Sequence, residues 1–227
     1  MRFETGRVIA AVRNSGEFDI ALDSDVKVIF CLSTGIMSVA SQSLMAKRAG
    51  KKLFVHMDLC DGVGKDRAGV EFLKNAGVYG IISTRVSIIK HARELGLKTV
   101  QRFFIVDSHS IDTTLEGLKS AKPDMIEIMP GTVTKIIARL CEKTEIPIIA
   151  GGLIETEDEI KAAFSAGAHA VSTGKKSLWY YQYNCLMVSP NQISYHYYDI
   201  YPEANRNYRK NVLFCYLQKK GFMISYM

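Results

Sequence analysis

Two short apolar segments in the second half of the chain each end in small residues that suit an anion. The first, at residues 147–150, is followed by two glycines, and the second, at residues 170–171, is followed by Ser-Thr-Gly. Glycines at the ends of successive strands let backbone N–H groups approach an oxyanion closely. A tight-turn role is the alternative. The predicted phosphate site comprises Gly151, Gly152, Ser172, Thr173 and Gly174.

Polar side chains near the ends of the other apolar segments are candidates for the rest of a small ligand. His56 and Asp58 are two residues apart, which places them on the same face of a strand, although a core histidine is the plainer interpretation. Arg102 and Glu127 lie inside apolar segments, so we expect an ion pair between them, either structural or ligand-binding. Ser83 belongs to a Ser-Thr pair that could instead cap the following helix. The full set is Arg13, His56, Asp58, Ser83, Thr84, Arg85, Arg102 and Glu127.

Several other chemistries find no support in the spacing of residues. DGVGKD around Lys65 lacks the G-x-x-x-x-G-K-[ST] spacing of a nucleotide-binding loop, although an anion-facing loop remains open. His56 and Asp58 have no third ligand close in sequence, so no metal is expected. There is no Ser-His-Asp or Cys-His signature. The spacing of residues therefore supports neither a nucleotide-binding loop, nor a metal site, nor a catalytic triad.

Eight apolar segments rich in Val, Ile and Phe alternate with helix-period segments over residues 1–179. This alternation predicts an α/β, TIM-barrel-like (β/α)8 fold, with a doubly wound open sheet as the alternative. Because 179 residues is small for such a barrel, we expect trimmed helices, above all the first and last. The loops after strands seven and eight commonly build a phosphate site. The apolar segments are residues 7–13, 26–32, 53–59, 78–83, 99–106, 125–129, 146–150 and 170–173.

Composition changes after Trp179. Ten of the eleven tyrosines lie between Tyr180 and Tyr226. Tyrosines and basic residues suit RNA, since aromatic rings stack on bases, but no RNA-binding motif appears there. We expect residues 180–227 to be an atypical, poorly ordered extension outside the domain formed by residues 1–179.

The composition of the 227-residue chain fits a reduced cytoplasmic setting. The five cysteines include no C-x-x-C pair, and the N-terminus has no charged-then-apolar leader. No apolar run approaches the roughly 18 residues of a membrane span, so no membrane partner is expected. The net charge of +6 permits contact with RNA without requiring it.

Motifs along residues 7–179 resemble those of the bacterial glycerol-3-phosphate-responsive antiterminators. The segment at residues 31–45 departs from the family pattern. The resemblance implies a compact barrel that regulates rather than catalyses, with no catalytic residue and no cofactor. It also implies that the barrel responds to glycerol 3-phosphate as effector and acts on leader mRNA of glycerol-metabolism genes to prevent termination. It also implies that the residues of both predicted sites bind the ligand. The motifs are VIAAVRN, KKLFVHMDLCDGVGKDRAGVEFL, YGIISTR, LGLKTVQRFFIVDS, KPDMIEIMPG, IPIIAGGLIETEDEI and AGAHAVSTGKKSLW.

These observations lead to one main hypothesis and one rival. In the first, phosphate binds backbone N–H groups of the glycine-rich loops, and the His56, Asp58 and Glu127 side chains meet glycerol hydroxyls, with Arg102 supplying charge. In the rival, a barrel enzyme acts on a small phosphorylated substrate as an isomerase, lyase or phosphodiesterase, with Asp58 and Glu127 as acid and base. A homo-oligomer is left open. RNA-contact candidates, unless they are simply solvated, are Lys47, Arg48, Lys51, Lys52, Lys175 and Lys176.

Overall fold

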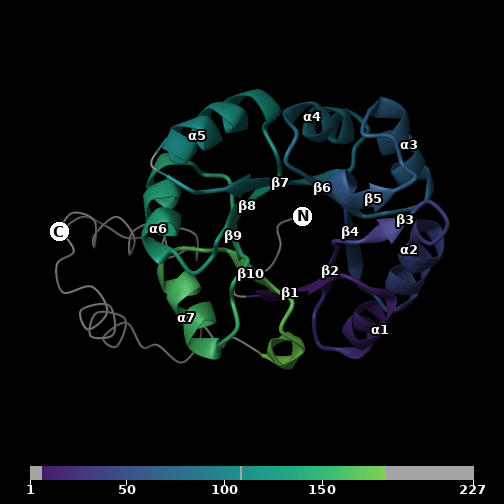
Figure 1. Cartoon of the computed structure of the whole chain (residues 1–227), viewed down its shortest axis with the longest axis horizontal. Coiled ribbons are helices and arrows are strands. Elements are labelled where there is room, and N and C mark those ends of the chain that lie inside the picture. The colour runs from purple at the N-terminus through teal and green to yellow at the C-terminus, as the bar shows by residue number, and fades with distance from the viewer. Residues whose placement is uncertain (1–6, 108, 182–227) are drawn as a thin grey trace, which may run out of the picture. The chain divides into compact units, whose positions relative to one another are not determined.

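Eight parallel strands close into a barrel in the computed structural model, which describes residues 7–107 and 109–181 (Figure 1). Pairing of the first strand with the last closes the ring, in the order β1-β10-β9-β8-β7-β6-β4-β2. The predicted (β/α)8 fold is therefore confirmed. The barrel strands are β1 (Arg7–Val12), β2 (Val28–Cys31), β4 (Lys52–His56), β6 (Gly80–Ser83), β7 (Lys98–Phe104), β8 (Met125–Met129), β9 (Ile148–Gly151) and β10 (Ala170–Thr173).

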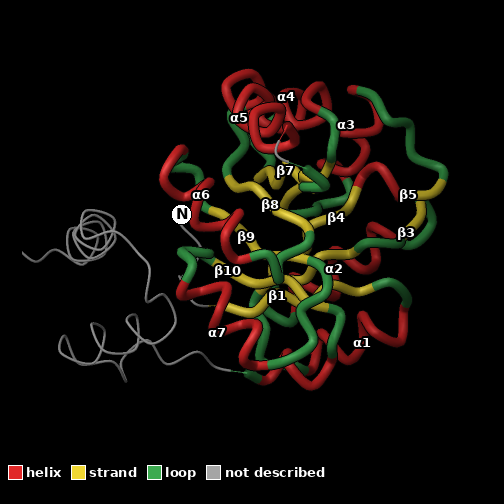
Figure 2. Tube along the Cα trace, turned by 60° about the vertical axis from the view of Figure 1, so that its left-hand side comes forward, coloured by secondary structure: helices red, strands yellow, loops and turns green. Residues whose placement is uncertain are grey.

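Seven α-helices surround the strands in the described part of the chain, and a 3-10 helix, η2 (Lys176–Tyr180), follows the last strand (Figure 1 and Figure 2). The first helix is not trimmed, because α1 is nine residues long, like α3, α4 and α7. The last helix is trimmed, because only the short η2 follows the last strand among the residues described. The helices are α1 (Ser15–Asp23), α2 (Val39–Arg48), α3 (Arg67–Asn75), α4 (Val86–Glu94), α5 (His109–Ala121), α6 (Thr134–Lys143) and α7 (Glu157–Ser165).

A second, two-stranded parallel sheet lies beside the barrel (Figure 1 and Figure 2). It pairs β3 (Thr34–Gly35) with β5 (Cys60–Asp61), and β5 follows a short 3-10 helix, η1 (Met57–Leu59). The predicted strand at residues 53–59 is therefore too long, since β4 ends at His56. Part of the segment that departs from the family pattern forms β3 and the start of α2.

The inward-facing residues of the barrel form an apolar plug at its centre. Because strand side chains alternate, every second residue points inward, and Phe54 is one of these. Gly80 pairs with Phe54, whose ring fills the place where a Cβ at residue 80 would lie. The plug comprises Ile9, Val28, Phe30, Phe54, Ile82, Val100, Met125, Ile149 and Ala170.

Local signals in the sequence explain where several helices begin and end. Thr156 and Glu159 form a capping box at the start of α7. The glycines that follow the ends of α2, α3, α4 and α7, which are Gly50, Gly77, Gly96 and Gly167, all have positive φ, for example 80° at Gly96. None of the helices in the described ranges combines the length and apolar character needed to cross a membrane.

Candidate functional site

A polar layer lies directly above the apolar plug, at the carboxyl end of the barrel. The Nε atom of Arg102 lies 2.6 Å from Oε2 of Glu127, and the Ser172 hydroxyl donates to Oε1 of Glu127 at 2.5 Å. The Arg102 and Glu127 side chains are only 6% and 1% exposed. The predicted ion pair is therefore confirmed, and it is satisfied on both carboxylate oxygens, as burial of a charge requires.

His56 belongs to the same layer but keeps one ring nitrogen unused. The residue is 4% exposed, and its Nδ1 is buried without a hydrogen-bond partner among the described residues. Burial lowers the pKa of His56, and the nearby positive charge of Arg102 lowers it further. The lowered pKa favours the neutral imidazole at pH 7.

Gly151 completes the layer by allowing close approach. A Cβ there would lie 2.5 Å from Oε1 of Glu127 and 2.7 Å from Oγ of Ser172. On its other side the loop after β8 is equally close, because a Cβ on Gly131 would lie 2.7 Å from the Gly151 nitrogen. Gly131 is not among the predicted site residues, although its place in the Pro-Gly pair after an apolar segment could have indicated it.

The two loops of the predicted phosphate site lie above this layer. Gly152 has φ 74°, and Leu153 follows at φ 59°, so two successive residues adopt a left-handed backbone that is costly for leucine. The Thr173 hydroxyl donates to the Ile154 carbonyl at 2.6 Å and joins the two loops. Since the Ser172 and Thr173 hydroxyls both have protein partners, backbone N–H groups are left to meet an anion here.

Two further contacts fix the loop after β10. The Trp179 indole N–H donates to the Thr173 carbonyl at 2.8 Å, and Trp179 is buried. Arg13 extends from the end of β1 so that its guanidinium lies 3.0 Å from where a Cβ on Gly174 would be. A permanent cation therefore lies against the glycine-rich loop. Trp179 is not among the predicted site residues, and its position five residues after the Ser-Thr-Gly motif is the one feature of the sequence that could have indicated it.

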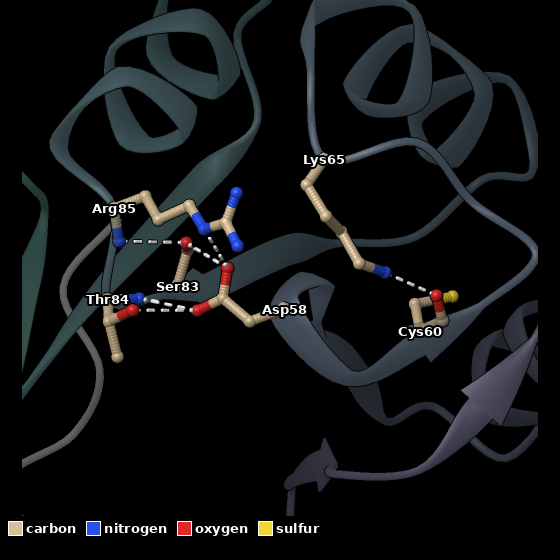
Figure 3. Close-up of polar contacts among 6 residues, drawn as sticks. All are labelled: Asp58, Cys60, Lys65, Ser83, Thr84 and Arg85. Carbon is tan, nitrogen blue, oxygen red and sulfur yellow. Dashed lines mark hydrogen bonds and ion pairs between the residues drawn. The ribbon is translucent and has the colours of Figure 1, made fainter.

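Asp58 is the centre of a separate group of contacts on the rim (Figure 3). Its carboxylate accepts from the Ser83 hydroxyl at 2.8 Å, from the Thr84 N–H at 2.8 Å and from the Thr84 hydroxyl at 3.1 Å. The Nε atom of Arg85 lies 3.6 Å away. Burial alone raises the pKa of Asp58, but the hydrogen bonds from Thr84 and Ser83 outweigh it, so the pKa lies below its ordinary value.

This arrangement corrects one expectation from the sequence and excludes one alternative. Asp58 does not share a strand face with His56, because the chain turns into η1 after β4 ends. Ser83 does not occupy the capping position of α4, which belongs to Arg85, although the Ser83 hydroxyl accepts from the Arg85 N–H at 3.0 Å. Asp58 thus joins η1 to the loop after β6.

The loop around Lys65 is held by its own contacts. The Lys65 ammonium donates to the Cys60 carbonyl (Figure 3). Asp66 caps α3 by accepting from the Gly69 N–H at 2.9 Å. These contacts fix the loop against the small sheet.

The predicted RNA-contact residues lie at two opposite ends of the barrel. Lys47 and Arg48 end α2, and Lys52 begins β4, so they lie at the amino end of the strands. Lys175 and Lys176 follow β10 at the carboxyl end. The prediction that Lys51 contacts RNA is wrong.

Lys51 is a structural residue, which is why it cannot serve as an RNA contact. Its ammonium donates to the carbonyls of Ser24 at 2.5 Å and Val26 at 2.8 Å, and the side chain is buried. An ammonium held in this way ties the end of α1 to the barrel and cannot reach a nucleic acid.

Comparisons with known proteins agree with this architecture. The family described as glycerol-3-phosphate responsive antiterminator matches residues 8–179. The crystal structure of the glycerol uptake operon antiterminator regulatory protein from Listeria monocytogenes str. 4b F2365 is 32% identical, with a TM-score of 0.75, covering 79% of this chain and 97% of that one. A glycerol uptake operon antiterminator-related protein from Thermotoga maritima MSB8 is 30% identical, with a TM-score of 0.69, covering 77% and 98%.

The chain is also similar to one further sequence relative and to a more distant solved structure. Uncharacterized protein YgcP of Escherichia coli (strain K12) is 37% identical over 173 residues, which is 76% of this chain and 91% of the relative. Deoxyribose phosphate aldolase from Aeropyrum pernix, at 13% identity and a TM-score of 0.59, shares the barrel fold alone. The match over nearly the whole barrel shows that this chain belongs to the glycerol-3-phosphate responsive antiterminator family.

Proposed function

We propose that this protein is a ligand-gated antiterminator that binds glycerol 3-phosphate at the carboxyl end of its barrel and then acts on leader mRNA of glycerol-metabolism genes. The observation that carries the proposal is the unpartnered Nδ1 of buried His56, which lies in a polar layer beneath glycine-rich loops. A buried polar atom without a partner costs free energy, and a ligand hydroxyl would satisfy it. The family to which the chain belongs supports the identity of that ligand.

The geometry suggests how each part of the ligand binds. The phosphate lies on backbone N–H groups of Gly152 and Gly174, and the Arg13 guanidinium beside Gly174 supplies the positive charge. A glycerol hydroxyl donates to Nδ1 of His56. Asp58 contributes indirectly, because its carboxylate is already occupied by Ser83 and Thr84 donors.

The same contacts favour binding over turnover. A general acid or base needs a free carboxyl group whose pKa lies near the working pH. Both oxygens of Glu127 are engaged by Arg102 and Ser172. The pKa of Asp58 lies below its ordinary value, which makes it a weak base. These observations support a sensing role over the isomerase, lyase or phosphodiesterase alternative.

A calorimetric titration with glycerol 3-phosphate tests the ligand assignment. We expect saturable binding to the wild type and an affinity about 100-fold weaker in Gly152→Val, because a β-branched residue cannot hold the left-handed backbone that presents the N–H groups. Glycerol and inorganic phosphate are titrated separately as controls, since each supplies half of the ligand. Unchanged affinity in Gly152→Val would remove this phosphate site.

The regulatory part is tested by binding to leader RNA with and without glycerol 3-phosphate. We expect the ligand to raise RNA affinity, because it binds one arrangement of the loops better than another. Thermal unfolding of the wild type with ligand provides the control for simple stabilisation. Turnover of glycerol 3-phosphate together with ligand-independent RNA binding would contradict the proposal.

A further inference from the structure

We propose that leader RNA contacts the amino end of the barrel, opposite the ligand-binding loops, through a basic surface on the last turns of α2 to α5. This inference rests on the proposed RNA-binding function and locates the RNA-binding surface on the barrel. We call this surface the basic end. Its residues are Lys47, Arg48, Lys74, Arg93, Lys119 and Lys122.

The topology brings these residues to one end of the molecule. In a (β/α)8 barrel each helix runs back against its strand, so the carboxyl ends of all helices gather where the strands begin. Last turns with basic residues occur in the consecutive helices α2, α3, α4 and α5, and Lys143 continues the pattern in α6. These helices follow one another around the barrel (Figure 1). Their basic residues therefore lie along one continuous arc.

The charges of the basic end are not neutralised within the described residues. All of its side chains are exposed, and none takes part in an ion pair there. Two of the neighbouring acids are engaged by other residues. Asp124 is bound by Lys98 at 2.7 Å and by Thr99, and Glu94 lies 3.7 Å from both Arg67 and His91. A polyanion would therefore meet uncompensated positive charge.

The helix dipole explains part of this pattern but not all of it. One cation in a last turn stabilises a helix by complementing its negative end. Arg48 is a second cation on α2, and Lys122 lies beyond the end of α5. The turns after α2 and α4 are open, since no heavy atom lies within 4 Å of where a Cβ on Gly50 or Gly96 would be, whereas a Cβ on Gly77 after α3 would lie 3.4 Å from the Ser43 hydroxyl. The arc therefore offers an accessible path for a phosphate backbone.

One helix start at the opposite end of the barrel is acidic. The first turn of α7 carries Glu157, Asp158 and Glu159 close to the ligand-binding loops. These acids would repel RNA phosphates. Of the predicted RNA contacts, the inference keeps Lys47 and Arg48 and removes the pair Lys175 and Lys176.

The experiment measures binding of full-length protein, saturated with glycerol 3-phosphate, to a labelled RNA hairpin. The hairpin carries the leader inverted repeat of the glycerol-uptake genes from the same genome, and fluorescence anisotropy is recorded at several salt concentrations. The test variant is Lys74→Gln with Lys119→Gln. The matched control, Lys135→Gln with Arg139→Gln, removes the same charge from exposed positions of α6. A third variant, Lys175→Gln with Lys176→Gln, probes the other end.

We expect the test variant to bind about tenfold more weakly and to reduce the slope of log K against log salt by roughly 1.5, as two lost phosphate contacts would. The other two variants should stay within about twofold of the wild type. Loss of binding in the Lys175/Lys176 variant, with the Lys74/Lys119 variant unaffected, would overturn the inference and leave the proposed function intact. An equal loss in all three variants would also overturn it. A wild type that binds no RNA with ligand present would refute the proposed function itself.

Discussion

At the scale of single residues, Glu127 organises the interior of the site. Its two oxygens contact Arg102 from β7 and Ser172 from β10, so one carboxylate on β8 joins three strands. The cost of burying both charges is met only while all three partners are present. This makes the layer sensitive to the loss of any one partner.

Replacing Glu127 by Gln should destabilise the protein by about 3–5 kcal/mol, because it leaves the Arg102 guanidinium buried without a counter-charge. Urea unfolding followed by circular dichroism measures the change. The double variant Arg102→Met with Glu127→Met serves as control, since it removes both charges, and it should recover most of the lost stability. A single variant within about 1 kcal/mol of the wild type would show that the ion pair is not needed for folding.

Asp58 should make stability depend on pH. Its pKa is lower in the folded state than in the unfolded chain, so its contribution is fully present above the unfolded value, near pH 4, and is lost as the pH falls through the lower, folded value. Asp58→Asn should therefore cost about 1–2 kcal/mol at pH 7 and much less at pH 3. Urea unfolding of both proteins at the two pH values checks this. A difference that stays constant with pH would contradict the assignment.

At the scale of elements, the loops after β8, β9 and β10 behave as one unit. The Gly131 N–H donates to the Gly151 carbonyl at 2.5 Å, and Thr173 binds the Ile154 carbonyl. Trp179 in η2 then holds the Thr173 carbonyl. A change in any one of these loops is therefore transmitted to the others through backbone contacts.

The variant Gly151→Ala tests whether these three loops depend on their close packing at Gly151. The added methyl would fall 2.5 Å from Glu127 Oε1, so we expect a loss of about 1–3 kcal/mol and much weaker ligand binding. Gly16→Ala in α1 is the matched control, because its nearest contact would be an ordinary 3.6 Å to Asn14. That control should keep the wild-type stability or exceed it slightly. Equal behaviour of the two variants in thermal unfolding and calorimetry would show that the loops tolerate a side chain at Gly151.

At the scale of the whole molecule, closure of the barrel requires the chain only as far as η2. β1 pairs with β10, and Leu178 and Trp179 then add buried apolar surface to the core. The expected extension at residues 180–227 lies, apart from Tyr180 and Tyr181, outside the described residues. The packing of the barrel is therefore complete at η2.

A chain that ends after Tyr181 should keep its melting temperature within about 3 °C of the full-length protein, because every barrel contact described above is retained. A chain that ends after Gly174 should lose several kcal/mol, as removal of a buried tryptophan does. Thermal unfolding by circular dichroism compares the two. A large loss in the longer truncation would show that the last residues stabilise the barrel.

The sequence predicts most of this fold and about half of the detail in its site. Parallel strands are recognisable because they are buried on both faces, and Arg102 and Glu127 are recognisable because buried charges need partners. The place of Asp58 could not be predicted, since the two-residue periodicity ends where η1 begins. The burial of Lys51 was equally hidden, because its partners are carbonyls from a distant helix end.

The Trp179 contact places a natural fluorophore beside the glycine-rich loop. This is the only tryptophan of the chain, and its indole N–H is bonded to a carbonyl of the glycine-rich loop. Emission from a buried indole responds to the dipoles around it, and a phosphate arriving at Gly174 would bring two negative charges into that neighbourhood. The protein therefore contains its own optical reporter, so occupancy of the site can be followed by intrinsic fluorescence without any label.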